Sequence, residues 1–257
     1  MNFKIIARQF HEDGFAIASG LFLEREVAEI KKEMEDLIRE VSPKLKAGES
    51  HYDMKPGNVY YEDTPSMPIK SMFCLDQHRT RFQAVREDER LIRIVRAIFP
   101  EGDIIGDGVI FFAKSARHGS VTPPHQDNAF QCWVPPDALI ATLALDESTP
   151  ENGALTCQKG SLKAGLLPHL PSGVLGFSQR LVEPLDTRAY PETQLCMKPG
   201  DVSFHHVNTV HGSGANQTDR NRWQLGIGYR SSRAQPDMEA RRLYQESLEK
   251  LHQKGAK

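Results

Sequence analysis

The feature that most limits the possible folds is a succession of short apolar runs over residues 103–232. Runs such as DIIGDGVIFFAKS, ALIATLALDES and RWQLGIGYRSS are rich in apolar and β-branched residues, and Gly, Pro, Asn and Asp separate them. Short strands with turn residues between them are typical of an antiparallel barrel or sandwich. This stretch therefore predicts a β core.

Helical patterns lie on both sides of this core. The runs EREVAEIKKEMEDLIREV and RFQAVREDERLIRIVRAIF repeat their apolar residues every three or four positions, as one face of a helix does. A charged run near the end of the sequence has the character of a helix as well. We predict one domain over residues 1–257, with a helical part over about 1–100, the β core over about 103–232 and a C-terminal helix over about 236–253.

Composition and charge narrow the function classes. The net charge of -2 offers no basic field for nucleic acid or for anionic lipid, and no apolar run approaches the length of a membrane span. The opening MNFKIIARQFHEDGF lacks the apolar core of a signal peptide, and the four cysteines are scattered without a CxxC pair. We therefore expect a cytoplasmic protein with reduced cysteines, a small-molecule substrate, and neither nucleic acid nor membrane as partner. The sequence does not indicate an oligomeric state.

The run TPPHQDNAF contains a candidate pair of metal ligands. His125 and Asp127 are two positions apart, and on an extended strand that spacing points both side chains to the same face. Such a pair can be a buried hydrogen-bonded pair, or it can be two of the three protein ligands of a metal ion. A third ligand is needed before the second interpretation is preferred.

Candidates for the third ligand occur in KPGDVSFHHVNTVHGSGANQTDRNR, which contains His205, His206 and His211. In a continued strand His205 and His211 would share a face, so alternation alone does not choose between them. Arg222 then enters another apolar run, where a guanidinium is costly unless it meets an anion such as a carboxylate. Two histidines and one carboxylate on one side of an ion are typical of non-haem Fe(II) oxygenases, which keep the other positions open.

The segments PPHQD, LALDESTPENGAL and KPGDVSFHHVNTVHGSGANQTDRNR, together with the opening FHEDGFAIASGLFLEREV, resemble the phytanoyl-CoA dioxygenase family of Fe(II)- and 2-oxoglutarate-dependent oxygenases. The resemblance covers about residues 10–230. It implies a mainly β fold with flanking helices, a double-stranded β-helix or jelly roll of the cupin-like kind. It also implies oxidation, usually hydroxylation, of a small organic substrate by O2, coupled to conversion of 2-oxoglutarate to succinate and CO2.

Transferred position by position, the resemblance implies that His125, Asp127 and His211 are the iron ligands. The motif that follows the ENG turn in the family is PGSH, whereas this chain has KGSL. That departure removes a histidine outside the iron shell, and we expect no effect on metal binding.

The resemblance also implies a set of co-substrate contacts. Arg222 would bind the distal carboxylate of 2-oxoglutarate, with Ser213 and Gln126 close by. Lys70 matches a basic position that contacts the co-substrate in the family. Thr142 lies where some members place a bulkier neighbour of the co-substrate.

Two alternatives use the same two histidines and one aspartate. A zinc-dependent hydrolase would hold a water on the metal, and a non-catalytic β-barrel protein would only bind a ligand. A hydrolase gives no reason for Arg222 to follow the distal ligand. The run FFAKSARHGS places Lys114, Arg117 and His118 just before the candidate metal strand, which favours an anionic substrate such as a carboxylate, phosphonate or thioester, but the sequence does not identify that substrate.

Overall fold

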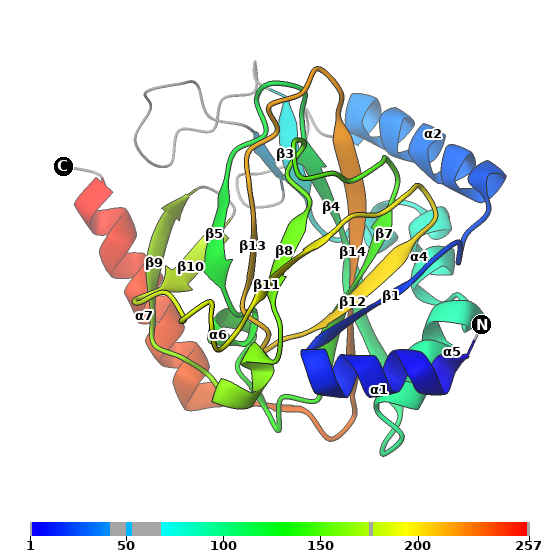
Figure 1. The fold of residues 1–257 in the computed structure, drawn as a ribbon. Coiled ribbons are helices and arrows are strands. Elements are labelled where there is room, and N and C mark those ends of the chain that lie inside the picture. Colours follow the sequence, from blue (N-terminus) through cyan, green and yellow to red (C-terminus); the bar gives the residue numbers. More distant parts are fainter. Residues whose placement is uncertain (1, 42–49, 53–67, 175–176, 256–257) are drawn as a thin grey trace.

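The structure is a computed structural model, and it describes residues 2–41, 50–52, 68–174 and 177–255 (Figure 1). The helices of this part are α1 (Phe3–Asp13), α2 (Glu24–Val41), α3 (Leu75–His78), α4 (Thr80–Arg86), α5 (Glu89–Ile98), α6 (Asn128–Gln131), the 3-10 turn η2 (Ser161–Ala164) and α7 (Met238–Gly255).

The strands, in chain order, are β1 (Phe15–Ala18), β2 (Ser50–Tyr52), β3 (Ile69–Met72), β4 (Ile104–Lys114), β5 (Thr122–His125), β6 (Trp133–Val134), β7 (Ala138–Ala144), β8 (Leu155–Gln158), β9 (His169–Val174), β10 (Phe177–Leu181), β11 (Glu192–Leu195), β12 (Val202–His206), β13 (His211–Ser213), β14 (Arg222–Ser231) and β15 (Gln235–Pro236).

Two antiparallel sheets form the centre of the molecule. In the described part of the chain, a seven-stranded sheet has the order β1-β12-β7-β14-β4-β3-β2, and a four-stranded sheet has the order β11-β8-β13-β5. Figure 1 shows the smaller sheet lying across the larger one, with α1, α2, α4 and α5 gathered on one side. This arrangement confirms the predicted jelly roll with flanking helices. Strands β1, β2 and β3 come from the N-terminal part and extend the edges of the larger sheet.

The larger sheet is apolar on the face that the helices cover. Phe111, Leu143, Phe204 and Ile227 come from four neighbouring strands and are buried in one cluster with residues of α1, α2 and α5. The alternation of side chains along a strand then turns the intervening residues toward the smaller sheet. Those residues include the buried polar side chains of Lys114, Thr142, Ser203, His205, Arg222 and Gln224. The inner face of the sheet is therefore unusually polar.

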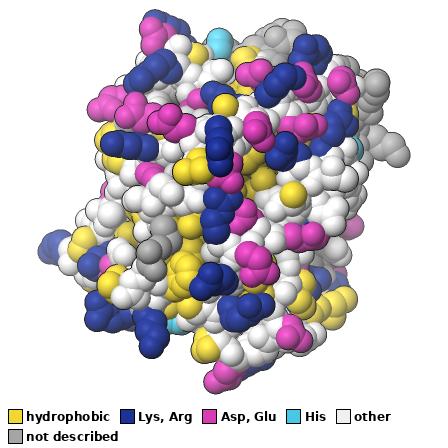
Figure 2. Space-filling view, turned by 90° about the vertical axis from the view of Figure 1, so that its right-hand side faces the viewer, with side chains coloured by type: hydrophobic (Ala, Val, Ile, Leu, Met, Phe, Trp, Pro, Cys, Tyr) yellow, Lys and Arg dark blue, Asp and Glu magenta, His cyan; other side chains and the backbone are white. Residues whose placement is uncertain are grey.

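Capping side chains and a glycine mark the ends of two helices. The run RFQAVREDERLIRIVRAIF, predicted as one helical pattern, forms two helices, because α4 ends at Arg86 and Asp88 begins α5. The side chain of Asn2 accepts a hydrogen bond from the backbone of Lys4 at the start of α1, and Gly14 ends that helix with a φ of 88°. Asp88 caps α5 in the same way. On the helical side of the molecule, basic and acidic side chains are interspersed (Figure 2). No helix in the described ranges has both the length and the apolarity needed to cross a bilayer.

Candidate metal centre

The two halves of the candidate metal centre come from neighbouring strands of the smaller sheet. Strand β5 ends at His125, and β13 begins at His211, which is its direct partner in the antiparallel register. Asp127 lies beyond the strand, in helical conformation immediately before α6. Strand alternation alone does not describe this pair, because Asp127 lies beyond the strand and the turn after β5 brings its carboxylate to His125.

The three side chains converge on a small volume. The Oδ1 atom of Asp127 lies 3.4 Å from the Nε2 atom of His125 and 3.6 Å from the Nε2 atom of His211. The three candidate ligand atoms lie within 4.8 Å of one another, and all three residues are buried. Metal–nitrogen bonds of about 2.1 Å at right angles would place their donor atoms about 3 Å apart. The donor atoms are therefore near enough to close around a single ion.

Backbone carbonyls fix the protonation of both imidazoles. The Nδ1 atom of His125 donates to the carbonyl of Pro123 (2.8 Å), and that of His211 donates to the carbonyl of Thr209 (2.9 Å). With the proton on Nδ1, the lone pair of each Nε2 atom faces the cluster, as a metal ligand requires.

The protonation states of the buried side chains favour a bound cation. Burial lowers the pKa of His211 to about 3, although the charge of Asp127 opposes this shift, so the imidazole is neutral at physiological pH. Burial alone would raise the pKa of Asp127, but the neighbouring histidines lower it well below its usual value. The donor set therefore consists of neutral nitrogen and anionic oxygen.

His205 has a role that the sequence did not reveal. It lies on the inner face of β12, and its Nε2–H donates to the Oδ2 atom of Asp127 (3.1 Å). His125 and His211 lie near the other oxygen, so the structure separates the two histidines that strand alternation could not. His205 orients the carboxylate so that one oxygen faces the cluster. The sequence indicated this role of His205 only through strand alternation, which places it on the same face of its strand as the other buried polar residues.

The neighbouring His206 faces the helices instead. Its ring packs near Phe10, and its Nδ1 atom accepts a hydrogen bond from the backbone of Asn208 (2.9 Å). Burial lowers the pKa of His206 to about 4. It belongs to the packing of α1 and not to the metal cluster.

Arg222 is a buried cation. It begins β14 on the inner face of the larger sheet with 5% of its surface exposed, and within the described ranges no carboxylate lies within 4.0 Å of it. Its Nη1 donates to the side-chain oxygen of Gln224, while its Nε makes no hydrogen bond to any residue that the structure describes. Burial lowers its pKa to about 10, although the charge of Asp146 opposes this shift. Such a guanidinium fits an anionic ligand.

Polar groups without partners continue from this arginine along the inner face. The hydroxyl of Ser203 and the amide nitrogen of Gln224 are buried and make no hydrogen bond to described residues. Thr142 is the register partner of Ser203 on the neighbouring strand, and it is buried as well. A dicarboxylate with a keto group suits such a row, since it offers acceptors along its length.

The remaining predicted co-substrate contacts lie in different surroundings. Ser213 follows His211 by two residues on β13, on the same strand face. Lys70 is buried on β3, and its Nζ donates to the hydroxyl of Ser120 (2.7 Å). Lys114 is the register partner of Arg222 and donates to the carbonyl of Ser120. Lys114 is therefore buried inside the fold with Arg222 and Lys70.

The side chain of Gln126 is hydrogen-bonded to backbone groups of the protein. Its side-chain nitrogen donates to the carbonyls of Gly165 (2.8 Å) and Asn208 (2.6 Å), and its side-chain oxygen accepts from the backbone of Leu167 (2.8 Å). All the polar atoms of this amide thus have backbone partners. The expected contact with 2-oxoglutarate stays a prediction, and the geometry shows a brace between two loops.

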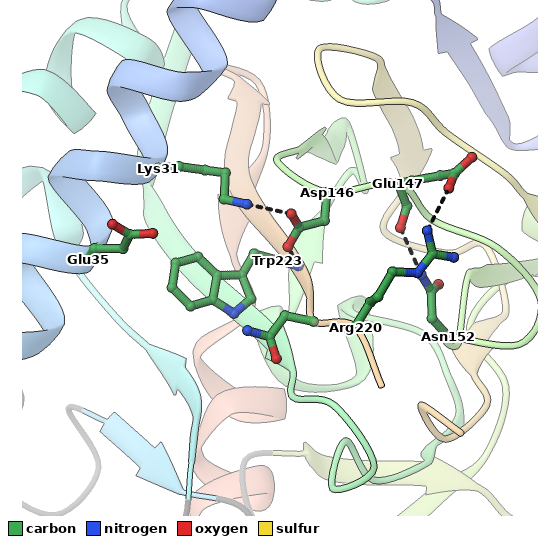
Figure 3. A pocket seen from close by; sticks show the side chains of 8 residues that line it. Lys31, Glu35, Asp146, Glu147, Asn152, Arg220 and Trp223 are labelled. Carbon is green, nitrogen blue, oxygen red and sulfur yellow. Dashed lines mark hydrogen bonds and ion pairs between the residues drawn. The ribbon is translucent and has the colours of Figure 1, made fainter. Parts of the chain in front are cut away.

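A cavity of about 380 Å³ lies apart from the cluster, on the side of the sheet that faces α2 (Figure 3). Lys31 and the backbone of Trp223 both bond the carboxylate of Asp146, at 2.6 and 2.9 Å. Since none of the three candidate ligands lines this cavity, we assign it no part in the chemistry.

Comparisons with known proteins agree with this geometry. The family described as phytanoyl-CoA dioxygenase matches residues 10–223. A probable alpha-ketoglutarate-dependent hypophosphite dioxygenase of Stutzerimonas stutzeri is 26% identical over 239 residues, which cover 89% of this chain and 79% of that protein. The peroxisomal phytanoyl-CoA dioxygenase of Mus musculus is 24% identical over 250 residues, with 89% and 68% covered.

Solved structures show the same fold. The epimerase SnoN, in complex with Fe3+, alpha ketoglutarate and nogalamycin RO, superposes with a TM-score of 0.70 at 20% identity, covering 90% of this chain and 84% of that one. The non-heme monooxygenase ThoJ superposes with a TM-score of 0.71 at 22% identity, covering 90% and 79%. With the family match over most of its length, the chain belongs to the phytanoyl-CoA dioxygenase family and is an iron- and 2-oxoglutarate-dependent dioxygenase.

Proposed function

We propose that the chain hydroxylates a small organic substrate, with His125, Asp127 and His211 as its iron ligands and Arg222 as the anchor of 2-oxoglutarate. The observation that carries the proposal is the buried guanidinium of Arg222, which faces the same interior as the ligand cluster and has no carboxylate partner among the described residues. A site that must hold a dicarboxylate beside a metal needs this combination.

The three ligands would occupy one side of the ion and leave the other side to the co-substrate and dioxygen. When bound, iron and 2-oxoglutarate supply the oxidation, in which 2-oxoglutarate is converted to succinate and CO2 and one oxygen atom enters the substrate. The protein contributes position and exclusion of water. His205 supports this by holding the second oxygen of Asp127, which favours binding through one oxygen only.

The inner row would hold the rest of the co-substrate. Arg222 would bind the distal carboxylate, and Ser203 and Gln224 would satisfy their buried hydrogen-bonding capacity on the ligand. Thr142 is the register partner of Ser203 and of Gly226, and we propose it as a neighbour of the co-substrate. We propose Ser213 and Lys70 as further contacts at this end of the barrel.

A zinc-dependent hydrolase would use the same ligands but would leave this row without a function. The same holds for a non-catalytic binding protein that lacks a carboxylate ligand. The deciding experiment measures oxygen consumption and succinate formation with Fe(II) and 2-oxoglutarate, beside samples loaded with Zn(II). Turnover that requires iron, oxygen and 2-oxoglutarate together supports the proposal, and hydrolytic activity with zinc alone would contradict it.

We also propose a cytoplasmic location. The support comes from cysteine chemistry, since Cys74, Cys132, Cys157 and Cys196 are all free thiols. Cell fractionation with an antibody against the chain tests this, and recovery in a membrane-bounded organelle would contradict it.

A further inference from the structure

A second cavity, of about 430 Å³, lies between the larger sheet and the helices α6 and α7. Ile110 and Ile140 project into it from β4 and β7, on the opposite side of the sheet from the helix-packed core. Phe130 of α6 and Tyr244 of α7 form the facing wall, with ring centroids 6.5 Å apart. Figure 1 shows α6 and α7 together at this end of the molecule. The cavity thus lies where the C-terminal helix meets the barrel.

Two of its walls lie next to residues of the metal centre. The ring of Phe130 stacks on the imidazole of His125, with centroids 6.3 Å apart and planes 28° apart. Ile140 is the register partner of His205, which bonds the carboxylate of Asp127. A molecule in this cavity would therefore lie one side chain away from the ligand cluster.

The interior of the barrel has two chemically different parts. The row that ends at Arg222 is polar and contains buried groups without partners, which suits the co-substrate. The cavity beside Phe130 is lined mainly by aliphatic and aromatic side chains, among them Phe73, Trp133 and Ile140. Apolar walls favour a ligand with an apolar body, because binding releases water from the apolar surfaces of both the cavity and the ligand.

One charged group on the wall lacks an ion pair. Arg241 of α7 lies over the ring of Trp133 at 4.8 Å and donates to the carbonyl of Gln131, and among the described residues no carboxylate lies within 4.0 Å of it. The acid that lines the same cavity, Asp107, is already paired with Arg230 at 2.9 Å. The unpaired charge on the wall is therefore positive.

From these contacts we infer that the cavity is the primary substrate site, and that the substrate is a small amphipathic organic anion. Its aliphatic or aromatic body would lie between Phe130 and Ile140, and its carboxylate or phosphonate would face Arg241. This inference rests on the proposed function, since it takes the His125 cluster to be the iron site. The anionic group of the substrate is then expected to contact the C-terminal helix and not Lys114.

The chain offers an internal reporter for the test. Its two tryptophans are Trp133, which lines this cavity, and Trp223, which lines the separate cavity of Figure 3. In a Trp223→Phe background, emission comes from Trp133 alone. We would titrate this variant, loaded with Zn(II) and 2-oxoglutarate, with octanoate and with 1-octanol, which has the same carbon skeleton and no charge.

Octanoate should change the emission of Trp133 and bind more tightly than 1-octanol. Arg241→Gln should weaken octanoate roughly tenfold to a hundredfold and leave 1-octanol unchanged, because only the charged bond is lost. The matched control is Arg242→Gln, since that neighbouring arginine is exposed and pairs with Glu239 and Glu246. It should behave as the parent. Equal binding of acid and alcohol, equal effects of the two variants, or no emission change with octanoate would each overturn the inference.

A second readout connects the cavity to the metal. Under anaerobic conditions, the visible absorption band of the protein with Fe(II) and 2-oxoglutarate should shift when octanoate is added, and the shift should be smaller in Arg241→Gln. An unchanged band beside clear octanoate binding would show that the cavity is not coupled to the iron, and would overturn the inference alone. Failure of the band to form at all would instead contradict the proposed function.

Discussion

Replacement of Arg222 by methionine gives the sharpest test of the co-substrate site. If Arg222 anchors 2-oxoglutarate, the ligand-free variant should be at least as stable as the parent, whereas if Arg222 only braces β14, the variant should be less stable. Burial of the guanidinium lowers its pKa from 12.5 to about 10. That difference corresponds to about 3 kcal/mol of destabilisation of the folded protein, present at every pH below about 10. Methionine removes the charge but leaves Gln224 without its partner, at a cost of about 1–2 kcal/mol.

Without 2-oxoglutarate, the variant should therefore be as stable as the parent or more stable by about 1–2 kcal/mol, a rise of about 2–8 °C in melting temperature for a chain of this size. With 2-oxoglutarate the order should reverse. A fork to the distal carboxylate involves two charge-assisted bonds of about 1.5–3 kcal/mol each, and one replaces the existing bond to Gln224. We expect the dissociation constant of 2-oxoglutarate to rise by roughly one to three orders of magnitude.

The assay is a thermal melt of the Zn(II)-loaded protein over a 2-oxoglutarate titration. Arg220→Met is the matched control, since Arg220 is exposed and pairs at 3.5 Å with Glu147. Arg220→Met should change neither the melting temperature nor the affinity for 2-oxoglutarate appreciably. If Arg222 only braces the start of β14, Arg222→Met will melt several degrees lower and keep its affinity for 2-oxoglutarate. That pair of results would refute the reasoning.

Further expectations follow from the same contacts. Asp127→Ala should abolish the binding of one Fe(II) per chain while the fold survives, as a metal titration beside circular dichroism would show; retained iron would contradict the ligand assignment. His205→Ala should weaken Co(II) binding about tenfold to a hundredfold in a chelator competition, and His205→Gln should recover part of the loss, because an amide can still donate to the carboxylate. Gln126→Ala should lower the free energy of unfolding by about 2–3 kcal/mol without changing the affinity for 2-oxoglutarate, and a selective loss of that affinity would restore its predicted contact. In the metal-free protein, the pKa values of His206 and His211 are lowered to about 4 and 3 from 6.5, so the unfolded chain binds protons that the folded chain does not. From these two histidines, denaturant titrations should show constant stability above pH 7 and a loss approaching about 2.7 kcal/mol per pH unit between about pH 6 and pH 4, with about half that slope in His206→Gln.

The sequence predicted the parts of the site that follow from local rules. Arg222 was identifiable because a charge entered an apolar run, and the strands of the core were visible from their composition. Strand alternation could not choose between His205 and His211, because the choice depends on which strands become neighbours; the family resemblance favoured His211. In the structure, the register that places His211 opposite His125 separates the two. Sheet order of this kind is set by packing across the whole chain and leaves no local pattern.

Gln126 shows what the sequence could not reveal. The family resemblance implied a contact with the co-substrate, which stays a prediction, whereas the turn after β5 directs its amide to backbone groups of two other loops. A buried glutamine must satisfy its hydrogen bonds, and the partners nearest in space are invisible in the sequence. The surroundings of Lys114 are hidden in the same way, because its register partner Arg222 is far away along the chain.

The pairing of β13 with β5 gives a bound metal ion the properties of a cross-link. Residues 125 and 211 are distant along the chain, so an ion held between them closes a long loop that the unfolded chain would otherwise leave open. For a covalent bridge, a loop of about 100 residues corresponds to about 4.7 kcal/mol of lost chain entropy in the unfolded state. A bound ion contributes a comparable stabilisation only while residues of both strands coordinate it. Removal of the metal should therefore speed unfolding of the entire smaller sheet, and a peptide containing only TPPHQDNAF should bind the ion far more weakly.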